Sequence, residues 1–277
     1  MMRLVTASAS TDRGLGVTAG LDAGLARELG AHCEGLGYHS LWSNDEPDAR
    51  GLDTLAELGR ATAWIQLGVG VLPLHRHRPA QIAADVDRLG IDPARLWLGI
   101  GSGALSAQVD PLRRAVEELR TLLPETTRIV VAAMRPRLCR LGGAVADGVL
   151  MNWMPPPQAA RAREWVREGA AEREGTAPVA ASYVRVALGP GGLGRLLEEE
   201  RFYRTINEGH RRHFATMDVP VGSVGIAASQ RSDLLQALAP YHSALDLPIV
   251  RVLAQAGSLR AVAEAAAPAI GPSTGNR

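Results

Sequence analysis

Short apolar segments alternate with longer amphipathic segments along almost the whole chain of 277 residues. Several short segments are continuously apolar, as in residues 129–133, and such runs are typical of parallel strands covered on both faces. In the longer segments the apolar residues recur three and four positions apart, as at Leu25, Leu29 and Cys33, which predicts helices buried on one face. The predicted strands are residues 4–8, 40–42, 66–71, 96–100, 128–133, 148–152, 180–187 and 249–253.

The predicted helices fall between these strands, at residues 21–35, 52–63, 79–89, 111–123, 137–146, 157–173, 229–238 and 258–267. Eight strand–helix units favour a closed α/β fold, the (β/α)8 TIM barrel with parallel strands, over an open doubly wound sheet. Such a barrel uses roughly 250 residues as one domain. We therefore expect a single domain at residues 1–270, a flexible tail at 271–277, and a charged helical insertion at about 190–220 between strands 7 and 8.

The composition excludes several classes of protein. All 30 Lys+Arg side chains are arginine, whereas Schiff-base enzymes and P-loop NTPases need a lysine. The net charge of +1 provides no overall field for a polyanion, so no nucleic-acid partner is expected. There is no apolar run of about 18 residues, no signal-peptide core and no cysteine framework, so we expect a cytoplasmic protein without a membrane partner.

In a barrel of this kind the reacting groups lie at the carboxyl ends of the strands. After strand two, Asp45 and Glu46 could recognise a polar ring or transfer protons, and capping of the next helix is the structural alternative. After strand three, His75 is the candidate for proton transfer on the substrate side, and His77 is the other histidine that could face the site. These two histidines lack a third ligand nearby in the sequence, so no metal site is predicted.

Glycines in the next strands predict close approaches of the backbone. Gly68 and Gly70 interrupt strand three, where glycine marks a bulge or a nearby ligand. Residues 98–103 resemble a dinucleotide-binding fingerprint, but the third glycine comes one position early and the strand is the fourth rather than the first. We expect these glycines to let a flat cofactor ring lie against the strand end.

Strands five and six also end in polar or aromatic groups. Arg135 lies at the start of a predicted helix, where a guanidinium can bind phosphate or simply face solvent. Asn152 and Trp153 bring an amide and an indole to the end of strand six. The chain has no Gly-x-Ser-x-Gly motif and no cysteine at a predicted strand end, which argues against a hydrolase with an activated nucleophile.

Three segments, residues 67–74, 78–83 and 95–103, resemble the luciferase-like monooxygenase superfamily in sequence and in order. Residues 146–156, Ala-Asp-Gly-Val-Leu-Met-Asn-Trp-Met-Pro-Pro, are similar more narrowly to its branch that uses the deazaflavin coenzyme F420. The similarity runs from about Leu4 to Pro268. It implies a (β/α)8 barrel that binds a reduced flavin or deazaflavin at the carboxyl ends of its strands.

The resemblance also implies roles for individual residues. A non-prolyl cis peptide bond is expected between Gly70 and Val71, as a backstop behind the cofactor ring, and Asp45 is expected to contact the ring. The other implied cofactor contacts are Ser102 and Gly103 at the ring edge, Asn152 and Trp153 in the ligand wall, and Met134 and Arg135 near the phosphate-bearing tail.

Three positions depart from the family's pattern. Glu46 stands where many deazaflavin enzymes have a histidine, so the histidine acid or base after strand two is missing. Ala104 replaces the catalytic glutamate of the sugar-phosphate dehydrogenases, which argues against glucose 6-phosphate as the substrate. Met134 and Arg135 replace a Gly-Gly pair, which would either narrow the binding of the tail or replace backbone amide contacts by a salt bridge.

The predicted function is hydride transfer between coenzyme F420 and an unidentified small organic substrate, with Asp45 and His75 as candidate catalytic residues. An FMN-dependent luciferase-like monooxygenase is the alternative enzyme. A cofactor-binding homologue without catalysis is the alternative from another class, favoured by Glu46 and Ala104. Because relatives are often dimers, a homodimer is expected.

Overall fold

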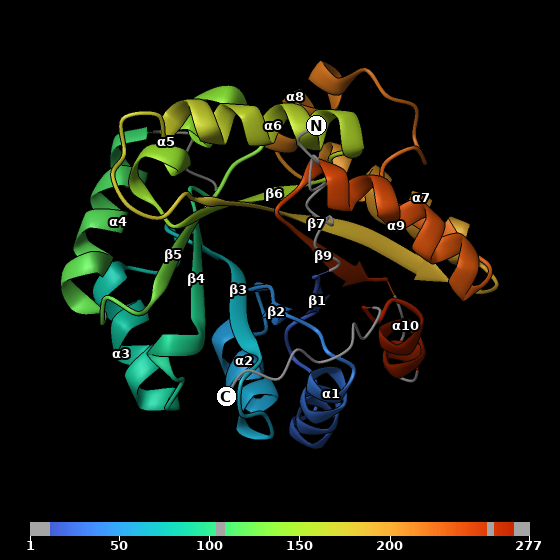
Figure 1. The fold of residues 1–277 in the computed structure, drawn as a ribbon, viewed down its shortest axis with the longest axis horizontal. Helices are drawn as coiled ribbons and strands as arrows, with labels where there is room; N and C mark the ends of the chain where they lie inside the picture. The colour runs from blue at the N-terminus through green and yellow to red at the C-terminus, as the bar shows by residue number, and fades with distance from the viewer. Residues whose placement is uncertain (1–11, 104–108, 254–257, 269–277) are drawn as a thin grey trace, which may run out of the picture.

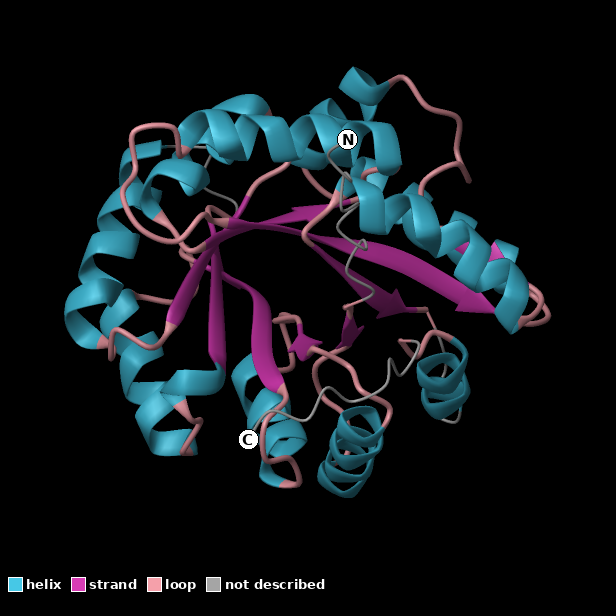
Figure 2. Ribbon diagram, in the orientation of Figure 1, coloured by secondary structure: helices cyan, strands magenta, loops and turns pink. Residues whose placement is uncertain are grey.

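The computed structural model describes residues 12–103, 109–253 and 258–268. Eight parallel strands close into a barrel surrounded by helices (Figures 1 and 2), which confirms the predicted fold class. Closure is completed by the pairing of β6 with β7, β7 with β9 and β9 with β1. The barrel strands are β1 (Gly14–Val17), β2 (Ser40–Ser43), β3 (Gln66–Pro73), β4 (Leu96–Gly101), β5 (Arg128–Ala132), β6 (Gly148–Asn152), β7 (Val179–Leu188) and β9 (Leu247–Val252).

The helices lie outside the strands, as the alternating pattern predicts. They are α1 (Ala23–Gly35), α2 (Gly51–Arg60), α3 (Pro79–Leu89), α4 (Val109–Leu122), α5 (Pro136–Val145), α6 (Pro156–Gly169), α7 (Gly192–Thr205), α8 (Glu208–Met217), α9 (Arg231–Ala244) and α10 (Leu259–Ala265), with a 3-10 turn at Pro93–Arg95. Three of them, α3, α5 and α6, begin at a proline, whose fixed φ suits the first turn of a helix. Helix α9 continues through Pro240 beyond the predicted end at residue 238, because Tyr241 and Ala244 bury its last turn.

The prediction that residues 4–8 form the first barrel strand is wrong. That segment lies outside the described residues, and β1 (Gly14–Val17) occupies the place between β2 and β9. Two of the four residues of β1 are glycine, which is uncommon in strands, so the sequence pattern did not indicate a strand here. In the barrel they are required, because a Cβ at Gly14 would lie 3.1 Å from the ring of Trp42, and one at Gly16 would lie 2.9 Å from the ring of Tyr183.

The insertion between the last two barrel strands contains α7 and α8, which confirms its helical character. It also contains a strand that the sequence did not predict, β8 (Ile226–Ala228), which pairs only with the end of β7. A separate apolar cluster joins the insertion to the carboxyl ends of the barrel strands: Trp153, Ala187, Leu196, Phe214, Val224 and Leu253. The insertion therefore covers part of the barrel mouth.

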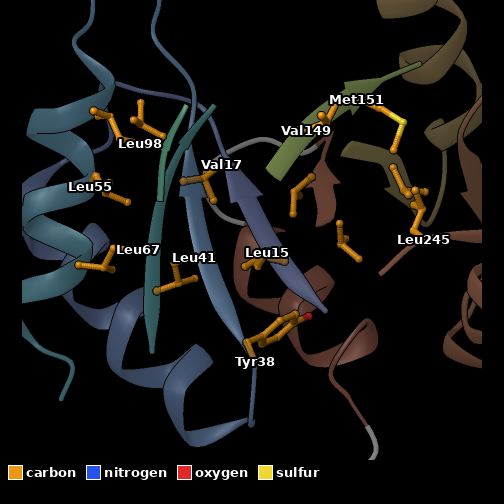
Figure 3. Close-up of a cluster of buried hydrophobic side chains, with 14 of the residues drawn as sticks. Leu15, Val17, Tyr38, Leu41, Leu55, Leu67, Leu98, Val149, Met151 and Leu245 are labelled. Carbon is orange, nitrogen blue, oxygen red and sulfur yellow. The ribbon is translucent and has the colours of Figure 1, made fainter. Parts of the chain in front are cut away.

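Apart from the cluster under the insertion, the core has two parts. The larger part lies between the strands and the helices, where Figure 3 shows Leu55 of α2 near Leu67 and Leu98 of the sheet. The smaller part fills the barrel lumen with Trp42, Trp97, Val130, Leu150, Ala181, Tyr183, Leu247 and Ile249. The ring of Trp42 lies 6.2 Å from that of Trp97 and 6.4 Å from that of Tyr183, centroid to centroid. The lumen is thus a packed core, and only its mouth is available for chemistry.

Substitution of Gly68 by alanine tests this packing. A Cβ there would lie 2.3 Å from the buried ring of Trp42, so we expect Gly68→Ala to cost about 1–3 kcal/mol of unfolding free energy through overpacking. The control is Gly194→Ala in α7, where a Cβ meets nothing within 4 Å and a gain of about 0.5–1 kcal/mol is expected. Urea unfolding measures both. Equal unfolding free energies of the two variants would show that the lumen can accommodate a methyl group at position 68, and would contradict the tight packing against Trp42.

Candidate functional site

The carboxyl end of β3 carries the irregularity that the resemblance implied. The Gly70–Val71 peptide bond is cis, and the pairing with β4 shifts register between Val69 and Leu72. Tyr183 donates a hydrogen bond from its hydroxyl to the carbonyl oxygen of Gly70 across the lumen, at 3.2 Å. The bulge is therefore held from inside the barrel, and Val71 is left half-buried at the mouth.

The glycines of β4 make room for this bulge. A Cβ at Gly99 would lie 2.2 Å from the carbonyl oxygen of Val69, and one at Gly101 would lie 2.9 Å from a methyl group of Val71. These two glycines therefore provide space for the β3 bulge, and they do not leave the end of β4 open for a cofactor ring. Beyond β4, Ser102 is half-buried and Gly103 is exposed with φ +60°, a conformation that favours glycine.

Asp45 is the centre of a polar cluster after β2. Its side chain is 3% exposed, and Oδ1 accepts a hydrogen bond from the backbone N–H of Gly51 at the start of α2, at 3.0 Å. The other carboxylate oxygen, Oδ2, lies 2.7 Å from Nε2 of His77 and is also paired with Arg76. Three donors from two neighbouring loops thus fix the carboxylate.

His77, rather than His75, is the histidine that the fold brings to Asp45. His77 is mostly buried, whereas His75 is exposed and its ring lies against Gly103. The loop after β2 carries no histidine, but the turn after β3 brings His77 against the carboxylate of that loop. The His75–Arg76–His77 run was visible in the sequence, but residues two apart on an irregular turn give no rule for which one faces inward.

Glu46 does not take the place of that histidine. Its side chain accepts a hydrogen bond from Asn44, and its backbone N–H donates to the carbonyl oxygen of Ala49 at 2.9 Å. Asn44 in turn accepts from Arg251 on β9 at 3.4 Å. Glu46 is therefore part of the polar rim of the mouth. The other departure in the sequence, Ala104, lies outside the described residues.

The residues after β5 line a cavity of about 830 Å³. The cavity lies among the first turns of α4 and α5 and one residue of α8, and its lining is Val109, Asp110, Pro111, Arg114, Arg135, Pro136, Arg137, Leu138, Arg140 and Arg212. Arg135 occupies the N-cap position of α5, as the sequence indicated. Met134 lies beside it but packs against the core and is not part of the lining.

This cavity is strongly cationic, because five arginines line it and Asp110 is its one lining carboxylate. Arg140 pairs with Glu168 and Arg212 with Glu208, both on the exposed surface. For Arg114, Arg135 and Arg137, no carboxylate of the described residues lies within ion-pair distance. Unpaired guanidinium groups beside two helix N-termini provide a site for phosphate or carboxylate groups.

The wall after β6 is more enclosed than the sequence suggested. Trp153 has a positive φ of 53° and is 1% exposed, beneath Tyr203 and Phe214 of the insertion. The side chain of Asn152 accepts a hydrogen bond from Arg185 on β7, a residue that no sequence motif identified. Asn152 and Trp153 therefore reach the mouth as partners of Arg185.

Two histidines of α8 lie beneath the same cover. His213 is buried, and its Nε2 lies 2.9 Å from the carbonyl oxygen of Trp153. Burial lowers the pKa of His213, and burial together with the neighbouring His213 and Arg185 lowers the pKa of His210 from 6.5 to about 4. The lowered pKa leaves the ring of His210 neutral near pH 7.

Other kinds of site find less support. Within residues 12–103, 109–253 and 258–268, no three His, Cys, Asp or Glu side chains gather as metal ligands. Cys33 and Cys139 are buried free thiols, and burial raises the pKa of each to about 12, so neither is a ready nucleophile. Among the helices that the structure describes, none is long and apolar enough to cross a membrane.

Comparison with known proteins agrees with this geometry. Residues 2–130 match the family model of the luciferase-like monooxygenases, which confirms the resemblance seen in the sequence. An F420-dependent secondary alcohol dehydrogenase, solved in complex with an F420-acetone adduct, superposes with a TM-score of 0.70 at 14% identity, over 90% of this chain and 96% of its own. At these identities the match shows the fold.

Two further structures share the fold. The coenzyme F420 dependent tetrahydromethanopterin reductase of Methanopyrus kandleri has a TM-score of 0.65 at 14% identity, over 91% of this chain and 97% of its own. The oxygenating constituent of 3,6-diketocamphane monooxygenase of Pseudomonas putida, in complex with FMN, has a TM-score of 0.61 at 15% identity, over 93% and 98%. The chain thus shares the fold of these three enzymes, two of them described as F420-dependent and one holding FMN.

The lowered pKa of His210 predicts how stability depends on pH. The folded chain binds a proton at His210 less readily than the unfolded chain, so acidification from about pH 6.5 toward pH 4 favours unfolding, and stability is fully present above that range. The unfolding free energy of the parent chain should fall when the pH is lowered from 7 to 5. In His210→Gln this fall should be smaller by on the order of 1 kcal/mol. Urea unfolding at several pH values measures this, and identical pH slopes would contradict it.

Proposed function

We propose that this chain is an oxidoreductase that binds coenzyme F420 at the barrel mouth and transfers hydride between the cofactor and a small organic substrate. The observation that carries the proposal is the arginine-lined cavity beside the end of β5. The resemblance assigns the loop after β5 to the phosphate-bearing tail of the cofactor. Five guanidinium groups around one open cavity fit an anionic tail of that kind.

The position of the cis bulge supports the same arrangement. The Gly70–Val71 bond and the half-buried Val71 lie at the carboxyl end of β3, where the resemblance expects the cofactor ring to rest. Ser102 and Gly103 follow the adjacent strand β4 and lie on the same rim. Ring and tail positions are therefore separated along the edge formed by β3, β4 and β5, with the substrate side left to β7 and β9.

His77 and Asp45 supply the proton-transfer group. Because Nε2 of His77 faces Asp45, Nδ1 is the ring nitrogen that would exchange a proton with the substrate. Asp45 itself is buried and fully engaged, so its role is to orient His77 rather than to exchange protons with substrate. Bound F420 would supply the hydride chemistry, and the chain supplies orientation and a proton. His77 also removes one of the two departures that favoured a non-catalytic homologue.

Cofactor choice is tested by absorbance titration of the purified chain with F420 and, separately, with FMN. Two of the similar structures are described as F420-dependent and one holds FMN, and residues 146–156 resemble the F420 branch. We expect micromolar binding of F420 and much weaker binding of FMN. Tight FMN binding without F420 binding would replace this proposal by the FMN-dependent monooxygenase.

Arg135 is the residue on which tail binding depends most directly. Removal of its charge in Arg135→Gln should weaken F420 binding about tenfold or more, because a charge-assisted contact to an anion contributes about 1.5–3 kcal/mol. The control is Arg167→Gln on α6, which removes an exposed arginine that does not line the cavity. Titration of both variants gives the dissociation constants. Equal affinities would contradict the placement of the tail.

His77→Asn should reduce the turnover of reduced F420 about 100-fold or more while leaving the dissociation constant of F420 nearly unchanged, because proton transfer rather than binding is lost. Turnover is followed by absorbance with a panel of ketones, aldehydes and enones. The matched variant His75→Asn changes the exposed histidine two residues away and should keep most of the activity. A larger loss in His75→Asn than in His77→Asn would return the role to His75.

A further inference from the structure

Two arginines point into the barrel lumen at its mouth. Arg185 of β7 and Arg251 of β9 are paired in register on adjacent strands, and they are 4% and 6% exposed. Each stands two residues beyond a side chain of the lumen cluster, Tyr183 and Ile249 respectively, and so shares its inward direction. A Cβ at Gly16 would lie 3.4 Å from Cδ of Arg251, which places that side chain inside the barrel.

Arg185 has one carboxylate partner. Its Nε lies 3.4 Å from a carboxylate oxygen of Glu199 on α7, and its Nη1 donates a hydrogen bond to the amide oxygen of Asn152. Aromatic rings surround the guanidinium: its Cζ lies 4.5 Å from the ring centre of Trp153, 5.1 Å from that of Tyr203 and 5.7 Å from that of Tyr183. Burial lowers the pKa of Arg185, and the neighbouring Arg251 acts in the same direction.

Within the part of the chain that the structure describes, Arg251 has only neutral hydrogen-bond partners. It donates to Oγ1 of Thr18 at 2.9 Å, to Oδ1 of Asn44 at 3.4 Å and to the carbonyl oxygen of Val252 at 3.3 Å. None of the ion pairs formed among the described residues includes it. Among the described residues, two buried cations therefore share one carboxylate, and one positive charge has no counter-charge there in a region of low dielectric.

We propose that Arg185 and Arg251 bind the carboxylate group of an anionic organic substrate. This inference rests on the proposed function, whose substrate class it names. A single carboxylate balances the one uncompensated charge, and guanidinium groups match its planar geometry. The rings of Trp153, Tyr183 and Tyr203 surround the guanidinium of Arg185 and hold it in place.

The position also separates this group from the cofactor. The tail cavity after β5 has its own arginines, whereas the paired arginines belong to β7 and β9. Arg251 contacts Asn44, which immediately precedes Asp45, the partner of His77. A substrate whose carboxylate lies on the arginine pair is thereby held on the side of the mouth where the proton-transfer group stands.

The test compares benzoate with benzamide, which have nearly the same shape and differ in charge. Binding to the cofactor-free full chain is measured by isothermal titration calorimetry at constant ionic strength. Benzoate should bind at least about tenfold more tightly than benzamide, and Arg251→Gln should abolish that preference. The control Arg260→Gln removes an exposed arginine of α10, 71% exposed, and should keep it.

Two further arms complete the design. The Arg135→Gln variant should keep the preference for benzoate, because Arg135 belongs to the tail cavity. The proposal is overturned if Arg135→Gln loses this preference while Arg251→Gln keeps it. Equal affinities of benzoate and benzamide for the unmodified chain would overturn it even if the Arg251 variant fails to fold. Failure of F420 to bind, with the benzoate preference intact, would remove the proposed function and leave the anion site standing.

Discussion

The structure depends on the way large rings fill the barrel lumen. Trp42 and Tyr183 occupy the space that glycines of β1 and β3 leave open, and Tyr183 also holds the Gly70 carbonyl oxygen. Because the lumen is packed beneath this level, ligands are confined to the mouth above it. The hydrogen bond from Tyr183 to Gly70 also fixes the position of the β3 bulge along the barrel axis. The residues of the candidate site lie around the mouth at this level.

Charge organises the mouth above this packed layer. One cationic region, the cavity around Arg135, lies outside the strand ends of the barrel, and a second, formed by Arg185 and Arg251, lies inside the lumen. Between them the carboxylate of Asp45 holds His77. A chain with an overall charge of only +1 thus concentrates positive charge in two places, where anionic groups of a cofactor and of a substrate can be received separately.

Much of the fold followed from local patterns, and each of the two missed strands has its own cause. Seven barrel strands and the surrounding helices were predicted close to their observed ranges, because periodicity depends on neighbours in the chain. Strand β1 was missed since its glycines are explained only by rings on other strands, and β8 since three residues carry too little pattern. In the site, Asp45 and Arg135 were identified from their places after strands, whereas Arg185 and Arg251 looked like ordinary residues of apolar strands.

The sequence by itself determined the alternating barrel, the helical insertion, the location of the cis bond through resemblance, and the absence of lysine chemistry. Only the tertiary structure decided which side chains meet. It selected His77 over His75 as the partner of Asp45, turned Asn152 and Trp153 toward Arg185, and set two arginines side by side. The physical reason is that barrel closure fixes the direction of each strand and rim turn relative to distant ones, and spacing along the chain contains no record of those directions.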